Sequence, residues 1–333
     1  MSDALLRVSD LRTYFHTDDG VVRAVDGVSF SVAPNQTLGV VGESGCGKSV
    51  TALSVLRLVK SPPGKLESGS MMLATDGGSV DLAKLPQRGR RIRAIRGRDV
   101  SMIFQEPMRA LTPVYTIGFQ IKEALQEHTG MGADEVTSTA VEMLRAVGMP
   151  DPEQRMNTYP HQLSGGMRQR GMIAMALVCR PKLLIADEPT TALDVTIEAQ
   201  ILALLKRLQE QFHMAILFIT HDLGVIAKMA DDVMVMYLGQ VMERARVRDL
   251  FHDPRHPYTQ ALFRSIPSMV EEPKQRLAVI QGSVPHPLTH SAGCPFAPRC
   301  DHASDRCAQK PPEFEVGRDH TVACWLHEGK SEE

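Results

Sequence analysis

The sequence predicts an α/β fold built on a largely parallel sheet. Short runs of aliphatic and β-branched residues are typical of strands and lie at residues 28–32, 38–41, 183–186, 215–220 and 232–237. The runs LLIA and AILFIT are continuously apolar, as strands buried on both faces must be. Helical periodicity over residues 197–211 lies between two of these strands, which is the alternation of an α/β protein.

Length and composition indicate more than one structural part. The 333 residues suffice for two domains or one enlarged domain, and a long insert at about 88–175 carries helical patterns at 117–128 and 134–147. The last 81 residues hold 10 of the 21 Pro, 6 of the 12 His and 4 of the 6 Cys. We therefore predict a catalytic domain at residues 1–252 with a helical lobe in the insert, and a small loop-rich appendage at 253–333.

Charge and hydropathy exclude several classes of protein. Lys and Arg total 37 against 39 Asp and Glu, so a net charge of -2 provides no general field for nucleic acid. No apolar run reaches about 18 residues, and the charged start MSDALLRVSDLR lacks the apolar core of a signal peptide. We expect a chain that neither spans a membrane nor is secreted, with cysteines that stay reduced.

Residues 42–49, GESGCGKS, have the pattern of a phosphate-binding loop. They follow the predicted strand 38–41 and open a helix predicted to run through Leu58, which is the context that such a loop needs. The glycines let backbone N–H groups turn onto phosphates, Lys48 is expected to reach the β- and γ-phosphates, and Ser49 to bind Mg²⁺. The expected nucleotide contacts are Gly42, Glu43, Ser44, Gly45, Cys46, Gly47, Lys48, Ser49 and Val50.

Two carboxylates directly follow the predicted strand 183–186. The carboxyl edge of an open α/β sheet is where ligands bind, so we expect Asp187 to hold Mg²⁺ through water. Glu188 is then placed to accept a proton from the attacking water or to polarise it. His221 follows the strand 215–220 in the same way and should emerge at the same edge.

The segment LSGGM, residues 163–167, is specific to one family. With it the chain resembles the ATP-binding cassette (ABC) ATPases, whose signature motif lies about twenty residues before the strand that ends in the paired carboxylates. The resemblance implies a P-loop ATPase core with a helical lobe. It also implies that Ser164, Gly165 and Gly166 contact the γ-phosphate held by an opposite subunit, so that hydrolysis needs a head-to-tail dimer.

The same resemblance assigns roles to other residues. It implies that Gln105 in FQEP is the Q-loop glutamine at the Mg²⁺, that Asp194 in TALD is the D-loop aspartate, and that His221 is the switch histidine. Phe15 or Tyr14 is expected to stack on adenine, and we favour Phe15.

The catalytic set expected from this resemblance is complete. It comprises Glu188, His221, Gln105 and Lys48, which favours a hydrolysing subunit over a regulatory one that only binds nucleotide. Met167 departs from the family, where most members have glutamine, but the signature serine and glycines are intact.

Six further motifs narrow the resemblance. They are FQEPMRALTP, YPHQLSGGMRQR, ADEPTTALDVTIEAQI, THDLGVIA, HPYTQAL and GCPFAPRC. Together they are similar to the peptide-permease ATPases, the oligopeptide and dipeptide importers whose relatives carry nickel, glutathione and other solutes. The resemblance spans residues 5–327 and implies ATP-driven peptide uptake, although it does not specify one solute.

This family implies a set of partners and a location. We expect a heterodimer with a second homologous ABC ATPase, two transmembrane permease subunits, an extracytoplasmic solute-binding protein acting indirectly, and no nucleic acid. The expected location is peripheral, on the cytoplasmic face of the cell membrane. The competing interpretation is a soluble ABC ATPase that acts on nucleic acid or ribosomes.

Four cysteines in the appendage form a candidate metal site. Cys294, Cys300, Cys307 and Cys324 are separated by five, six and sixteen residues, and four soft ligands suit either Zn²⁺ or an iron–sulfur cluster. Spacing alone does not choose between zinc, a cluster and no metal. The resemblance to family members with a four-cysteine tail implies a [4Fe–4S] cluster.

Three histidines lie close to these cysteines in the sequence. His302, His320 and His327 are candidates for ligands or for partners of ligands. In a loop-rich region we expect them instead to be solvated.

Overall fold

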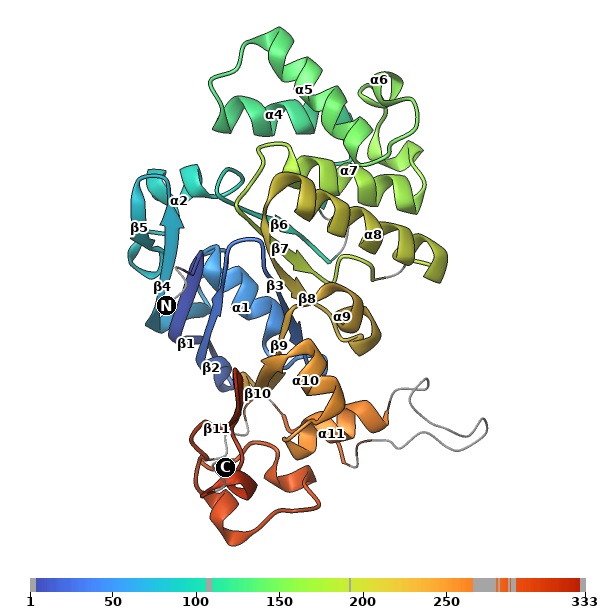
Figure 1. Ribbon diagram of the computed structural model, residues 1–333. Helices are drawn as coiled ribbons and strands as arrows, with labels where there is room; N and C mark the ends of the chain where they lie inside the picture. The colour runs from blue at the N-terminus through green and yellow to red at the C-terminus, as the bar shows by residue number, and fades with distance from the viewer. Residues whose placement is uncertain are drawn as a thin grey trace. The chain divides into compact units, whose positions relative to one another are not determined.

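The computed structural model describes residues 4–105, 110–191, 193–265, 280, 282–286, 288 and 292–329. The chain forms two compact units (Figure 1). The first consists of Met1–Leu6, Val32–Thr37 and Leu73–Ile219, and the second of Arg7–Ser31, Leu38–Met72 and Thr220–Glu333. Among the described helices, none is both long enough and apolar enough to cross a membrane.

Three parallel strands form the sheet of the first unit. They are β6 (Val100–Ile103), β7 (Leu183–Asp187) and β8 (Ala215–Ile219). Every residue of these strands is buried, which is why their sequences are continuously apolar. The parallel strands predicted at 183–186 and 215–220 are confirmed.

Helices of the first unit gather beside this sheet and include a helical lobe (Figure 1). In the lobe, α4 (Ile117–His128), α5 (Ala133–Ala146) and α7 (Gly165–Leu177) pack against one another. Side chains cap these helices where the sequence offers them: Thr116 accepts the Phe119 N–H at the start of α4. The helices predicted at 117–128 and 134–147 are therefore present.

Other elements complete the first unit. The long helix α8 (Val195–Phe212) lies where periodicity predicts it, and it joins β7 to β8. The shorter elements are β5 (Gly78–Asp81), η1 (Leu82–Lys84), α2 (Arg90–Ile95), α6 (Pro152–Arg155) and η2 (Pro160–Gln162).

The second unit holds most of a sheet that the sequence analysis largely missed. Its neighbouring strands are β2 (Gly20–Val32), β1 (Leu6–Thr17) and β4 (Gly64–Thr75), in that order. Only the end of β2, at 28–32, was predicted. The burial of β1 and β2 is irregular, so neither shows the continuous apolar run by which buried strands are recognised.

A second sheet in this unit is mostly antiparallel. Strand β3 (Thr37–Val41) pairs in parallel with β9 (Asp232–Tyr237), but β9 pairs antiparallel with β10 (Gln240–Arg246). The two residues between them, Leu238 and Gly239, both have positive φ, as a tight hairpin turn requires. The expectation of a largely parallel sheet therefore holds only for part of the molecule.

The C-terminal segment extends that antiparallel sheet. Strand β12 (His320–Val322) pairs antiparallel with β10 and with β11 (Phe314–Gly317), with Glu243 opposite Val322. The rest of this segment is loop-rich, as expected, with η4 (Ala297–Arg299), η5 (Asp305–Ala308) and η6 (Trp325–His327). The boundary at 252/253 stays a prediction.

Four helices belong to the second unit. Helix α1 follows the phosphate-binding pattern, as predicted, but it ends at Val55 and does not reach Leu58. Asp222 caps α9 by accepting the N–H groups of Gly224 and Val225. The bounds are α1 (Lys48–Val55), α9 (Leu223–Met229), α10 (Val247–His252) and α11 (Pro257–Arg264).

Candidate nucleotide site and cysteine pocket

The loop between β3 and α1 can be built only with glycine at two of its positions. Gly42 and Gly47 have φ of 152° and 99°. A Cβ atom on Gly42 would lie 2.2 Å from the carbonyl oxygen of Met236, and one on Gly47 would lie 2.1 Å from that of Ala24. Both positive φ and close backbone approach therefore require glycine, and the loop has the tight conformation of a phosphate cradle.

Lys48 lies folded onto its own loop. It is 5% exposed, and its Nζ donates to the carbonyl oxygens of Gly42 at 2.7 Å and Glu43 at 3.0 Å. An ammonium held at the mouth of such a loop is suited to exchange these carbonyls for phosphate oxygens. Exposure along the loop runs from exposed (Ser44, Gly45) through half-buried (Glu43, Ser49, Val50) to buried (Gly42, Cys46, Gly47, Lys48).

The adenine-stacking candidates differ in their surroundings, although both are half-buried residues of β1. The Tyr14 hydroxyl donates to Asp26 at 2.7 Å, and Arg23 lies over its ring. Burial, followed by this hydrogen bond, raises the pKa of Tyr14 to about 12. Phe15 instead lies close to Gly64, where its ring carbon would be 3.0 Å from an added Cβ. Which of them stacks on adenine stays a prediction.

His221 belongs to the second unit and is exposed. The preceding residue, Thr220, donates its backbone N–H to the carbonyl oxygen of Val40 at 3.2 Å. This contact lies near the carboxyl end of β3, from which the phosphate-binding loop starts, so His221 and the loop leave the same end of that strand.

The predicted base and the Q-loop glutamine meet in the first unit. Gln105 Nε2 donates to Glu188 Oε2 at 2.8 Å, and Thr191 Oγ1 donates to the same oxygen at 3.0 Å. Glu188 has a positive φ of 46° directly after β7, where its N–H donates to the Ile219 carbonyl. Asp187, the last residue of β7, is buried. The sequence-predicted residues of this unit thus converge at the carboxyl end of β7.

The signature segment occupies the exposed start of α7. Ser164 accepts the Met167 N–H at 3.3 Å as the helix cap, and Gly165 has open space where a side chain would be. Gly166 faces Ile197 of α8, whose own cap Asp194 accepts the Ile197 N–H at 2.9 Å. Ser164, Gly165 and Asp194 are all exposed, so the starts of α7 and α8 form one accessible surface.

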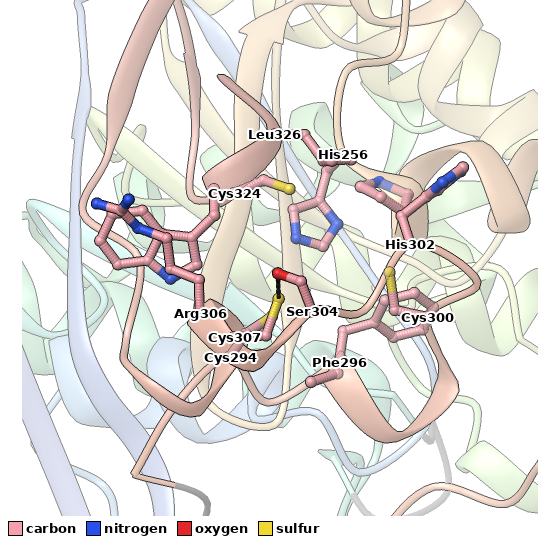
Figure 2. Close-up of a pocket in the computed structure, with 13 residues that line it drawn as sticks. His256, Cys294, Phe296, Cys300, His302, Ser304, Arg306, Cys307, Cys324 and Leu326 are labelled. Carbon is pink, nitrogen blue, oxygen red and sulfur yellow. Dashed lines mark hydrogen bonds between the residues drawn. The ribbon is translucent and has the colours of Figure 1, made fainter. Parts of the chain in front are cut away.

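The four C-terminal cysteines line a single cavity of about 100 Å³, which we call the cysteine pocket (Figure 2). Figure 2 shows the sulfur atoms of Cys300, Cys307 and Cys324 around the His256 ring. Cys294 completes the thiol lining, and the four are free cysteines. In the described part of the chain, no three His, Cys, Asp or Glu side chains are grouped so that they could hold a metal ion.

Burial raises the pKa of three of these thiols. The shift is upward for Cys294 and Cys300, and the pKa of Cys324 rises to about 11. The neighbouring thiols act in the same direction, whereas backbone hydrogen bonds from Phe296 and Leu326, among others, oppose the shift. The pocket therefore combines soft donors with backbone N–H groups that favour the thiolate form.

The prediction that all three nearby histidines are solvated is wrong for His320. It is buried, and its Nε2 lies 2.8 Å from Oε1 of Glu243, a carboxylate that is 0% exposed. His327 is half-buried, with Nε2 3.1 Å from the Arg255 carbonyl, whereas His302 is exposed and lines the pocket. The pairing of β12 with β10 causes the difference for His320, because it carries that residue to the inner carboxylate.

Sequence reasoning also missed His256, a buried residue that lines the cysteine pocket. Its Nδ1 accepts the Tyr258 N–H at 3.0 Å and so caps α11. Burial lowers the pKa of His256 to about 4, which keeps the ring neutral. The HPYTQAL motif contained this residue, but only the fold brings it to the cysteines.

Two family profiles match the chain. The ABC transporter profile covers residues 25–191, and the profile of the oligopeptide/dipeptide transporter C-terminal region covers residues 242–307. The chain belongs to the ABC transporter family. This ABC ATPase therefore has the P-loop ATPase core that its signature segment predicted.

Similar proteins extend the match over nearly the whole chain. The oligopeptide transport ATP-binding protein AppD of Bacillus subtilis is 51% identical over 330 residues, which is 99% of this chain and 98% of that protein. The dipeptide transport ATP-binding protein DppD of Escherichia coli is 47% identical over 94% of this chain and 93% of its own length. A dimeric ATP-binding cassette, MJ0796, solved with ADP and Pi, is 25% identical with a TM-score of 0.63 and covers 73% of this ABC ATPase and 99% of its own chain.

Proposed function

We propose that this ABC ATPase hydrolyses ATP to power the uptake of di- and oligopeptides, at the cytoplasmic face of a cell membrane. The observation that supports this most strongly is identity of 47–51% to ATP-binding proteins of oligopeptide and dipeptide transport along almost the entire chain. The agreement includes the C-terminal region typical of oligopeptide and dipeptide transporters. Nickel and glutathione are the alternative solutes.

In this proposal, the phosphate-binding loop and the first-unit carboxylates divide the chemistry. Lys48 binds the β- and γ-phosphates, and Ser49 and Asp187 hold Mg²⁺, the latter through water. Glu188 polarises the attacking water, and its hydrogen bond from Gln105 fixes the direction of the carboxylate. His221 positions the γ-phosphate and the water.

The partner of this subunit is a second, homologous ABC ATPase. The exposed starts of α7 and α8 support this, because Ser164 and Asp194 are accessible and Val195 is 81% exposed. An apolar side chain so exposed beside phosphate-binding candidates suits a surface that a partner covers. Two transmembrane permease subunits and an extracytoplasmic solute-binding protein complete the proposed importer.

The test of the catalytic assignment is the Glu188→Gln variant. Gln keeps the size of the side chain and an acceptor oxygen but is too weak a base, so we expect ATP hydrolysis to fall by about 10²–10⁴-fold while ATP binding is retained. Glu210→Gln, at an exposed position of α8, is the matched control and should hydrolyse ATP at the wild-type rate. Full hydrolysis by Glu188→Gln would refute the role of Glu188.

Transport itself is tested in cells that lack the chromosomal copy of this gene. Wild type and Glu210→Gln should restore uptake of a radiolabelled dipeptide, and Glu188→Gln should not. Recovery of the wild-type protein with nucleic acid or ribosomes, and not with two multi-span proteins and a second ATPase, would overturn the importer proposal in favour of the soluble alternative.

We further propose that the cysteine pocket holds a [4Fe–4S] cluster. The donor set fits such a group, because Cys294, Cys300, Cys307 and Cys324 line one cavity and backbone N–H groups hydrogen-bond to their thiols. When bound, the cluster supplies either a covalent staple for a region with little core or a one-electron centre. The four thiolates would be its protein ligands.

Metal analysis of anaerobically purified protein tests this assignment. We expect about four iron and four sulfide per chain. A Cys294→Ser/Cys300→Ser variant should lose both. Stoichiometric zinc, or no metal at all, would overturn the cluster assignment.

A further inference from the structure

The cysteine pocket lies next to the phosphate-binding loop in the structure, through residues that are far apart in the sequence. Arg299 immediately precedes Cys300, and its guanidinium reaches Glu43, the second residue of the loop pattern. The two residues are 256 positions apart in the sequence and belong to the same compact unit.

The contact between Arg299 and Glu43 is bidentate. Nη1 donates to Oε2 at 2.7 Å and Nη2 donates to Oε1 at 3.1 Å. The Arg299 side chain is 4% exposed, and its Nη1 also lies 3.2 Å from the hydroxyl of Tyr237. A planar fork that is desolvated and matched to a carboxylate fixes both position and orientation of its partner.

The backbone of Glu43 is held as well. Its N–H donates to the hydroxyl of Tyr258 at 2.9 Å, while its carbonyl oxygen accepts from Lys48 Nζ at 3.0 Å and from the Cys46 N–H at 3.3 Å. Glu43 therefore connects the lysine expected to bind phosphate with two residues, Arg299 and Tyr258, that lie outside the loop.

Both outside contacts lead to the wall of the cysteine pocket. Phe296, two residues after Cys294, lines the pocket and is buried. Its ring lies 5.2 Å from the Tyr258 ring and 5.4 Å from the Tyr237 ring, measured between centroids. The turn that carries Arg299 is closed by the Ala297 N–H donating to the Cys294 carbonyl and the Arg299 N–H donating to the Phe296 carbonyl.

We propose that Arg299 is a positioning residue for ATP binding, and that it transmits the state of the four thiols to the phosphate-binding loop through Glu43. Residues 294–300 carry two thiols, the Phe296 ring and the guanidinium within one short turn. A change in how Cys294 and Cys300 are held therefore moves Arg299 and, with it, Glu43 and the carbonyl that contacts Lys48. The inference rests on the proposed function for ATP binding by the loop, but it does not depend on which metal the thiols hold.

Two variants test the positioning role. Arg299→Lys keeps the charge but loses the fork, and Tyr258→Phe removes only the hydroxyl that accepts the Glu43 N–H. Each should raise the Kd for ATP and the KM of hydrolysis, by about tenfold for Arg299→Lys, while kcat at saturating ATP stays within about twofold. The matched control is Arg306→Lys, which alters another pocket-lining arginine that is exposed and paired with Glu328. It should leave both constants unchanged.

A double-mutant cycle tests the transmission. Cys294→Ser/Cys300→Ser should raise the Kd for a fluorescent ATP analogue in the wild-type background and have no further effect in the Arg299→Lys background, since the path is already broken. Trp325 fluorescence and the thermal midpoint, measured on every variant, identify any that has unfolded.

The outcomes separate this inference from the proposed function. A wild-type chain that binds no ATP would overturn the proposed function, and the inference with it. Normal wild-type binding with unchanged Kd in both Arg299→Lys and Tyr258→Phe would overturn the positioning role alone. Effects of the serine and lysine substitutions that simply add would overturn the transmission through Arg299.

Discussion

Removal of the buried carboxylate of Glu243 should loosen the C-terminal segment. This residue of β10 accepts three hydrogen bonds, from the Arg255 N–H at 2.7 Å, from the His256 N–H at 2.9 Å and from His320 Nε2 at 2.8 Å. It thereby joins the start of α11 and strand β12 to one buried point of β10. The side chain has no contact with solvent, so water cannot replace it.

The size of the effect follows from the number of donors left without an acceptor. In Glu243→Gln one oxygen remains for two donors, while the amide group opposes the third, and leaving one buried donor unpaired costs about 2–3 kcal/mol of unfolding free energy. In Glu243→Ala all three donors are unpaired, so we expect a loss of about 5 kcal/mol.

Trp325 provides the assay, because it is the single tryptophan of the chain and lies in this segment. Urea unfolding followed by Trp325 fluorescence should shift to lower denaturant in the order wild type, Glu243→Gln, Glu243→Ala. Glu315→Gln, at an exposed position of the neighbouring strand β11, is the control and should stay within about 0.5 kcal/mol of wild type. A Glu243→Gln variant equally close to wild type would refute the reasoning.

Three further predictions concern other parts of the molecule. Acidification from pH 6.5 to 4 should destabilise the fold by up to about 3 kcal/mol, because burial lowers the pKa of His256 to about 4 and the unfolded chain takes up the proton first; stability from this residue is complete above pH 6.5, and His256→Asn, which keeps a cap acceptor, should flatten this part of the pH profile of urea unfolding. Gly39→Val should lower the thermal midpoint by about 1–3 kcal/mol of overpacking, because a Cβ there would already lie 2.7 Å from the Ile226 side chain, and an unchanged calorimetric midpoint would contradict this. Native Cys179 and Cys46 should resist iodoacetamide at pH 8, since burial raises the pKa of both thiols, to about 11 for Cys179; rapid labelling seen by mass spectrometry before unfolding would show that they are accessible.

The nucleotide-binding elements were predictable because their signals are local. The loop pattern at 42–49 lies between a predicted strand and a predicted helix, and the structure places glycines where positive φ and close backbone contacts require them. The strands that end near Glu188 and His221 are continuously apolar, which is a property of adjacent residues. The contact between Gln105 and Glu188 was expected only through family resemblance, since 83 positions separate them.

The sequence by itself determined the class of fold, the family, the phosphate-binding loop and the four cysteines, because each depends on residues close together in the chain. The tertiary structure decided what is non-local: the antiparallel extension through β10 and β12, the burial of His320 on Glu243, and the approach of Arg299 to the loop. Strands of three or four residues carry too little periodicity to be recognised, and an ion pair across 256 positions leaves no local pattern. Such contacts arise only when packing brings distant segments together, so the link between the cysteine pocket and Glu43 becomes visible only in the folded chain.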